Sequence, residues 1–258
     1  MPTIIDHNRA KIISNMSLLS LLCILLAFPC IAIETVVIDP GHPSENGIGA
    51  KSPRGFQEID INWQVACRIR SLLDTGNHLR VILTKSSSAE KVTNRCRAEI
   101  ANAVSASLML RIHCDSGHGH GATLYYPSCP GSLGNDHGPT PGICSASAII
   151  ASRLQTTLSR FLGARFRVNP LRTDLQTAIG SRQGALTGSI YSKVPVVTIE
   201  LGYFDNPVDE SFLTASETQH ILAEALSTSI GESLRGLSGP IVSPRKDQSF
   251  PLQENRHE

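Results

Sequence analysis

The chain has 258 residues, 41% of them hydrophobic, and a formal net charge of +1. This length accommodates one large domain or two small ones. The near-neutral charge gives no reason to expect a nucleic acid or an anionic membrane surface as a partner. We therefore look for an ordinary globular protein whose function lies in specific side chains.

The N-terminus has the pattern of a secretory signal. Arg9 and Lys11 precede an apolar run over residues 18–28, and a short segment ending in Ala32 follows it. The run is too short to span a membrane comfortably. We expect residues 1–32 to be a cleaved signal peptide and the mature protein to be periplasmic or secreted, without a stable membrane span. An uncleaved N-terminal anchor is the alternative.

Export changes the interpretation of the cysteines, because disulfides form in oxidising compartments. Five cysteines follow the expected cleavage site, with no C-x-x-C spacing that would indicate a cysteine-based zinc site: Cys67, Cys96, Cys114, Cys129 and Cys144. A Cys129–Cys144 disulfide is the first expectation, since it would close the base of a loop rich in Gly and Pro. A Cys67–Cys96 disulfide is the second. Five is an odd number, so at least one thiol is free or paired elsewhere, and the alternative role for some of the cysteines is that of buried small apolar residues.

Strand-like and helix-like segments alternate along residues 33–236. Apolar or β-branched runs predict strands near residues 36–38, 79–84, 108–113, 122–126 and 196–200. Apolar residues at helical spacing predict helices over residues 61–72, 92–104, 149–161 and 221–234. This alternation predicts a single α/β domain, with a twisted, largely parallel sheet flanked by helices and an active site at the carboxyl ends of the strands.

Three segments fall outside this pattern. Residues 127–144 are rich in Gly, Pro and Ser and predict a surface loop, either a lid or a groove wall. Residues 237–258 are polar and contain three prolines, which indicates a disordered tail. Residues 169–193 have weak periodicity and receive no assignment.

Two histidines and one acid stand at the ends of predicted strands. His42 follows the strand-like run that stops at Asp39-Pro40-Gly41, His113 ends the run that starts at residue 108, and Glu200 ends the run that starts at residue 196. A catalytic zinc site takes three protein ligands and leaves one position for water. His42 and His113 are therefore candidate zinc ligands, although any single histidine is more often an ordinary structural residue.

The third ligand and the proton carrier come from the carboxylates. Glu58 is the leading candidate for the ligand, because it opens a predicted helix, and Glu45 and Asp60 are its rivals. Glu200 ends the most apolar strand, where desolvation raises the pKa of a carboxyl group, as suits a general base. A helix cap or a salt bridge is the alternative role for Glu200. His118 and His120 have glycine neighbours and indicate a flexible loop.

These motifs, in this order, resemble those of the zinc-dependent N-acetylmuramoyl-L-alanine amidases. The resemblance consists of D-P-G-H at 39–42, Glu58 opening a helix, Ile112-His113 at a strand end, and E-L-G-Y-F-D-N-P at 200–207. Arg95 or Arg97 with Ala101-Asn102 also resembles the family's R-x-x-x-A-N helix. The match extends over nearly the whole mature chain.

The resemblance implies a catalytic role and a substrate. It implies that His42, Glu58 and His113 bind Zn²⁺ and that Glu200 is catalytic. It also implies a peptidoglycan substrate, cut between the lactyl group of N-acetylmuramic acid and L-alanine. We expect a monomer in cell-wall remodelling or daughter-cell separation, with an unidentified protein activator as a further partner.

The chain departs from the family pattern at two places. Pro43-Ser44 follows the first histidine where the family usually has Gly-Gly, and Arg111 and Asp115 stand where the second motif often reads S-I-H-x-N. Neither departure removes a ligand, but both change the surroundings of the site. The alternatives are a zinc peptidase or carboxypeptidase on stem peptides, a sugar deacetylase, and an inactive wall-binding module.

Overall fold

A computed structural model describes residues 33–75 and 79–236 of the chain. The expected signal peptide at 1–32 and the expected tail at 237–258 lie outside the described residues. The following description concerns the compact unit that begins at Glu34.

Six strands form the central sheet in the order β2-β1-β3-β8-β4-β7. Their bounds are β1 (Glu34–Pro40), β2 (Leu79–Leu83), β3 (Leu108–Asp115), β4 (Thr123–Tyr126), β7 (Arg172–Thr173) and β8 (Val196–Tyr203). Strands β2, β1, β3 and β8 pair in parallel, β4 is antiparallel to β8, and β7 is parallel to β4. The predicted largely parallel sheet is therefore confirmed, and its β1, β3 and β8 strands end side by side.

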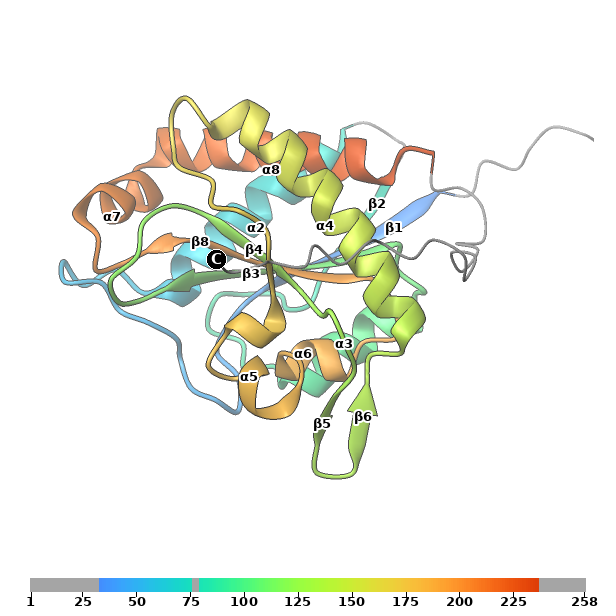
Figure 1. Ribbon diagram of the computed structural model, residues 1–258. Helices are drawn as coiled ribbons and strands as arrows, with labels where there is room; N and C mark the ends of the chain where they lie inside the picture. Colours follow the sequence, from blue (N-terminus) through green and yellow to red (C-terminus); the bar gives the residue numbers. More distant parts are fainter. Residues whose placement is uncertain (1–32, 76–78, 237–258) are drawn as a thin grey trace, which may run out of the picture. The chain divides into compact units, whose positions relative to one another are not determined.

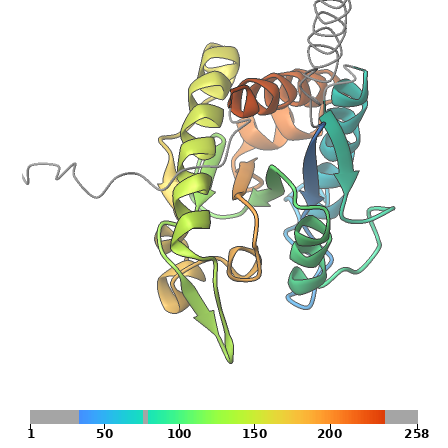
Figure 2. The same ribbon diagram turned by 90° about the vertical axis from the view of Figure 1, so that its right-hand side faces the viewer.

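Helices cover both faces of the sheet (Figure 1). Three long helices, α2 (Glu58–Asp74), α4 (Pro141–Leu162) and α8 (Ser216–Leu234), lie on one face and enclose the larger apolar core. Helix α7 (Pro207–Thr214) joins β8 to α8 on the same side. Helix α3 (Asn94–Ala103) lies on the other face, over a smaller cluster that includes Val37 and Met109. Figure 2 shows the sheet and the helices around it after a turn of 90°.

Two predicted helices are present with a different buried face. In α3 the buried residues include Arg97, Ala98 and Ala101, while Cys96 from the predicted apolar face is exposed. The expected face of α4 is also partly wrong, since Ile149 and Phe161 are 42% and 46% exposed. The helical spacing in α3 misleads because the helix buries an arginine and small residues against the inner strands of the sheet.

The two segments with weak patterns contain short regular elements. Residues 127–144 are not only loop: β5 (Gly131–Leu133) and β6 (Asp136–Gly138) form a hairpin that projects beside α4 (Figures 1 and 2). The unassigned stretch holds β7, a 3₁₀ turn at Asp174–Gln176, α5 (Gly180–Gln183) and α6 (Thr187–Ile190). Helices this short are below the length at which apolar periodicity is informative.

Neither expected disulfide is present, because all five cysteines of the described residues are free thiols. Cys67 belongs to α2 and Cys96 to α3, which lie on opposite faces of the sheet, so the sheet separates them. Cys129 and Cys144 point their sulfurs at different carbonyls, those of Gly184 and Pro139. Among the described helices, none has the length and apolarity needed to cross a bilayer.

Candidate active site

Three side chains converge at the carboxyl edge of the sheet and form a group with the geometry of a metal site. His42 follows β1, Glu58 opens α2, and His113 lies near the end of β3. One candidate ligand atom from each residue lies within 4.8 Å of the others. Among the described residues, no other group of three His, Cys, Asp or Glu side chains meets this geometry.

The two imidazoles are held in fixed orientations. Nδ1 of His42 lies 3.2 Å from the carbonyl oxygen of Gly47, which leaves Nε2 free to face Glu58 Oε1 at 3.7 Å. Nδ1 of His113 lies 3.1 Å from the same Glu58 oxygen. The rings meet edge to face, with 5.1 Å between their centroids. Burial lowers the pKa of His42, so its neutral, ligand-competent form is favoured.

Glu58 is buried and is held by hydrogen bonds on both oxygens. Oε2 accepts from the backbone N–H of Ala50 at 2.7 Å, and Oε1 accepts from the N–H of Cys114 at 3.1 Å and from Asn62 Nδ2 at 3.2 Å. Burial alone would raise the pKa of Glu58. The hydrogen bond and charge of His113, the charge of His42 and the Ala50 N–H outweigh burial and lower it to about 2. The carboxylate is therefore ionised at neutral pH.

Two glycines make room for this cluster. A Cβ on Gly41 would lie 2.3 Å from the ring atom Cε1 of His113, so the Gly in D-P-G-H is needed for the second histidine. Gly49 has a φ of +81°, and a Cβ there would lie 2.5 Å from Glu58 Oε2. A side chain at either position would displace a member of the group formed by His42, Glu58 and His113, which we call the metal-competent group.

The rival carboxylates lie elsewhere. Glu45 is exposed, and its Oε2 accepts from the backbone N–H of Asn94 at 2.9 Å, which caps the start of α3. Asp60 is half-buried on α2 and does not belong to the metal-competent group. His120 instead pairs with the buried Asp209.

Glu200 on β8 lies directly beside His113, its register partner on β3. Its Oε2 is buried without a hydrogen-bond partner among the described residues. Burial raises the pKa of Glu200 well above its usual range; the charges of Glu58 and Asp115 add to this effect, and the Arg111 guanidinium opposes it. This carboxylate is placed to exchange a proton with a group bound in front of it.

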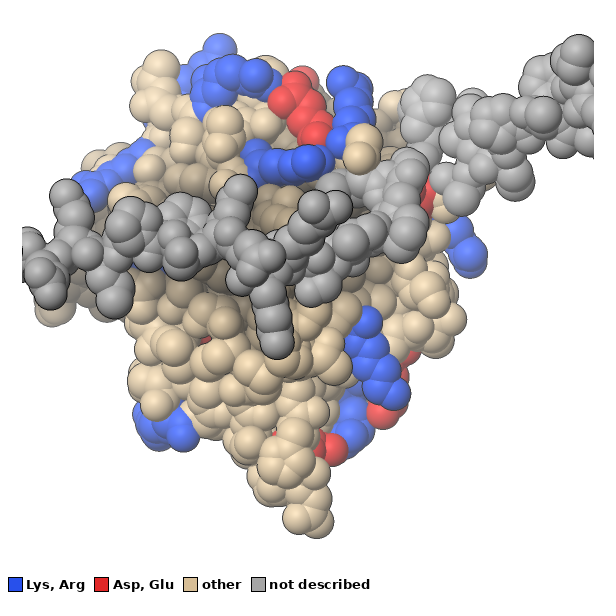
Figure 3. Space-filling model, turned by 45° about the vertical axis from the view of Figure 1, so that its right-hand side comes forward, with Lys and Arg blue, Asp and Glu red and all other residues tan. Residues whose placement is uncertain are grey.

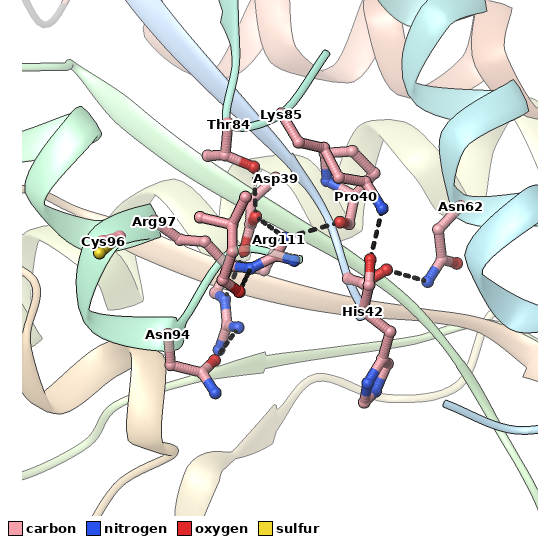
Figure 4. A network of polar contacts seen from close by, with 12 residues as sticks. Asp39, Pro40, His42, Asn62, Thr84, Lys85, Asn94, Cys96, Arg97 and Arg111 are labelled. Atoms are coloured by element: carbon pink, nitrogen blue, oxygen red, sulfur yellow. Dashed lines mark hydrogen bonds and ion pairs between the residues drawn. The ribbon is translucent and has the colours of Figure 1, made fainter. Parts of the chain in front are cut away.

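A buried polar network supports the turn that carries His42 (Figure 4). Arg97 donates from Nη1 to Asp39 Oδ1 at 2.6 Å and to the carbonyl of Pro40 at 2.7 Å, and from Nη2 to the carbonyl of Pro43 at 2.9 Å. Lys85 Nζ donates to the carbonyl of His42 itself. The backbone on both sides of His42 is thus held by charge-assisted hydrogen bonds.

This network resolves which arginine of the R-x-x-x-A-N pattern matters. Arg97 is buried, whereas Arg95 lies on the surface beside Asp136. Burial would raise the pKa of Asp39, but the guanidiniums of Arg97 and Arg111 hold it well below its usual range. Asp39 is therefore an anion that depends on its two arginines.

Replacing Arg97 by Met should strongly destabilise the fold. The substitution leaves the carbonyls of Val92, Pro40 and Pro43 without their Arg97 donor and removes one of the two cations paired with Asp39. Removing one partner of a buried ion pair costs about 3 kcal/mol or more. Urea denaturation should report this loss, and bound metal should fall as the His42 turn loosens. Arg95→Met on the same helix is the matched control, and an equal loss of stability there would contradict this role for Arg97.

The site opens into a pocket with a volume of about 210 Å³. Beside the metal-competent group, Glu200 and Arg97, its walls include residues that the sequence did not single out for a function: Asn94, Arg111, Ile179, Leu186, Thr187 and Thr198. Several come from the unassigned segment 169–193. The sequence indicated Arg111 only as a departure from the family pattern. Thr198 lies inside an apolar strand, and nothing in the sequence marks it as a functional residue.

Curated proteins of related sequence include amidases. The chain is 25% identical over 210 residues to the N-acetylmuramoyl-L-alanine amidase CwlM of Mycobacterium tuberculosis, covering 78% of this chain and 45% of that protein. It is 26% identical over 196 residues to the amidase LytC of Bacillus subtilis, covering 75% of this chain and 34% of that protein. The chain thus spans less than half the length of these two curated relatives.

Solved structures show the same fold. The amidase AmiC2 of Nostoc punctiforme superposes with a TM-score of 0.63 at 22% identity, covering 79% of this chain and 98% of that chain. The catalytic domain of CwlV from Bacillus (Paenibacillus) polymyxa var. colistinus gives a TM-score of 0.62 at 23% identity, covering 78% and 98% of the two chains. The family model described as N-acetylmuramoyl-L-alanine amidase matches residues 36–232, which include every side chain of the site, and the chain therefore belongs to that family.

Proposed function

We propose that this protein hydrolyses the amide bond between the lactyl group of N-acetylmuramic acid and L-alanine in peptidoglycan, with zinc as its metal. The observation that carries the proposal is the meeting of His42, Glu58 and His113 in front of Glu200, whose buried Oε2 has no partner among the described residues. Family membership supplies the substrate class.

The residues fit a catalytic zinc ion. Two imidazole nitrogens and one carboxylate oxygen form a donor set found at hydrolytic zinc sites, where the fourth position stays open. His42 Nε2, Glu58 and His113 would hold the ion. When bound, zinc lowers the pKa of water towards about 7 and polarises the substrate carbonyl.

The chain's own residues then control the proton. Glu200 Oε2 accepts a proton from the attacking water and delivers it to the leaving L-alanine nitrogen, as general base and then general acid. The hydrogen bonds of Glu58 to Ala50 and Cys114 fix the ligand carboxylate. The Arg97 network fixes the turn of His42, so both sides of the site are held before substrate arrives.

We also propose that the protein acts in the cell envelope as a monomer, after removal of residues 1–32, with residues 33–236 as its catalytic domain. The signal-like N-terminus and the relatives named as cell wall amidases support this location. On the described surface seen in Figure 3, Lys and Arg side chains are dispersed among uncharged residues.

The proposal is tested on purified peptidoglycan. The zinc-loaded protein should release new amino termini without new reducing sugars, because an amide and not a glycosidic bond is cut. Removing the metal with a chelator should abolish the release, and adding zinc should restore it. Release that persists with no detectable bound metal would contradict the zinc assignment.

A further inference from the structure

A second row of polar side chains lies one step deeper in the pocket than the metal-competent group. Asp39 on β1, Arg111 on β3 and Thr198 on β8 are neighbours in strand register. His113 and Glu200 form the next pair along β3 and β8 on the same face of the sheet, two residues further on. Arg111 and Thr198 line the same pocket as the metal-competent group.

Arg111 is nearly buried, with 6% of its side chain exposed, and two hydrogen bonds hold it. Nε donates to Asp39 Oδ2 at 2.9 Å, and Nη2 donates to Asn94 Oδ1 at 2.6 Å. A guanidinium has five N–H donors, so several remain after these two bonds. Helix α6 packs against the guanidinium through Gly188. The contact is so close that a Cβ on Gly188 would lie 2.2 Å from Arg111 Nη1.

The charge of Arg111 is not balanced by its direct partner. Asp39 pairs with both Arg97 and Arg111, so one carboxylate serves two guanidiniums. Two further acids feel the charge of Arg111: Asp174, whose Oδ2 accepts from the N–H of Leu186 while its Oδ1 has no partner among the described residues, and Glu200, the register partner of His113. What the floor of the pocket offers to a ligand is therefore the set of unused N–H donors on Arg111.

Thr198 adds an unused donor beside Arg111. Its side chain is buried, and its Oγ1 has no hydrogen-bond partner among the described residues. A buried hydroxyl without a partner costs free energy, which a ligand oxygen in the pocket would recover. A guanidinium and a hydroxyl together match a carboxylate, which accepts from both.

We propose that Arg111 and Thr198 bind a carboxylate of the peptidoglycan stem peptide, on the residue that follows L-alanine. The inference rests on the proposed function and adds a specificity determinant to it. Two residues along a strand span about 6.6 Å, which separates this row from His113 and Glu200. Two residues of extended peptide span at most about 7 Å, so a carboxylate on the second stem residue reaches the row while the amide lies at the metal-competent group.

The test compares two matched substrates. Both substrates have the γ-carboxyl of the second residue blocked as its methylamide, so that the α-position alone differs. N-acetylmuramoyl-L-alanyl-D-glutamate γ-methylamide has a free α-carboxylate there, and N-acetylmuramoyl-L-alanyl-D-isoglutamine γ-methylamide has an uncharged amide. The wild-type enzyme should prefer the carboxylate in kcat/KM by about 10- to 100-fold, the range expected for a hydrogen bond to a charged group. Arg111→Gln should remove most of this preference, and Thr198→Val should reduce it.

The variants separate binding from folding. Asp39 keeps Arg97 and Thr84 as partners in Arg111→Gln, and Thr198→Val preserves the volume of the side chain. Arg80→Gln, on the exposed side of β2, is the control and should keep the full preference. Zinc content and thermal unfolding are measured for all three variants.

The outcomes distinguish the two proposals. If the wild-type protein hydrolyses neither substrate nor peptidoglycan, the proposed function is wrong. If it hydrolyses both substrates without preference, or if both Arg111→Gln and Thr198→Val retain the wild-type preference, the carboxylate subsite is wrong while the function stands. A preference that Thr198→Val lowers supports the subsite even where Arg111→Gln fails to fold.

Discussion

Glu200→Gln should reduce the hydrolysis of peptidoglycan by about 10²- to 10⁴-fold, the contribution typical of a positioned general base. The amide of glutamine cannot take a proton from water, and the buried end of β8 offers no second carboxylate at that position. Zinc content and the free energy of unfolding should change little, because Glu200 lies beside the metal-competent group without belonging to it.

The pH dependence gives a second readout of the same residue. Burial and the charges of Glu58 and Asp115 raise the pKa of Glu200, so activity should fall on the acid side as the carboxylate becomes protonated. The residual activity of Glu200→Gln should lack this dependence. Glu99→Gln, an exposed carboxylate on α3, is the control. Loss of zinc in Glu200→Gln would make the residue a ligand, and near-normal turnover would remove it from the mechanism.

Replacing either histidine of the metal-competent group by Ala should eliminate both bound zinc and activity. Two remaining donors leave the ion without a complete set, and catalytic zinc sites use three protein ligands. Gly41→Ala should have the same effect with both histidines still present, because its Cβ would lie 2.3 Å from the His113 ring. Metal analysis of the purified variants measures these losses directly.

The rival carboxylates provide matched controls for this prediction. Glu58→Ala should lose zinc, whereas Glu45→Ala and Asp60→Ala should retain it, since neither residue lies in the metal-competent group. Full zinc occupancy in His42→Ala would overturn the ligand assignment. Zinc loss in Asp60→Ala together with retention in Glu58→Ala would move only the third ligand.

The sequence predicts those residues of the site that lie at the end of a strand or at the start of a helix. His42, His113 and Glu200 follow apolar runs, and a side chain at the end of a parallel strand lies at the ligand-binding edge of an α/β sheet. Glu58 is predictable because it opens a helix with clear apolar spacing. The structure brings the three candidate ligands together with Glu200 beside them.

Residues inside elements could not be predicted in the same way. Arg111 and Thr198 belong to apolar strands, and their role depends on register between strands that are far apart in the sequence. Helix α3 buries Arg97 and small residues, so its apolar spacing indicated the wrong face. The wall formed by Leu186 and Thr187 lies at the start of α6, a four-residue helix that leaves no periodic signal in the sequence.

Mass spectrometry of the products from purified sacculi tests the central claim most directly. The account predicts intact stem peptides with a free L-alanine amino terminus, and glycan strands whose N-acetylmuramic acid has a free lactyl carboxylate. Glu200→Gln should form both products about 10²- to 10⁴-fold more slowly. Stem peptides shortened within the peptide while still attached to the glycan would identify a peptidase and contradict the proposed reaction.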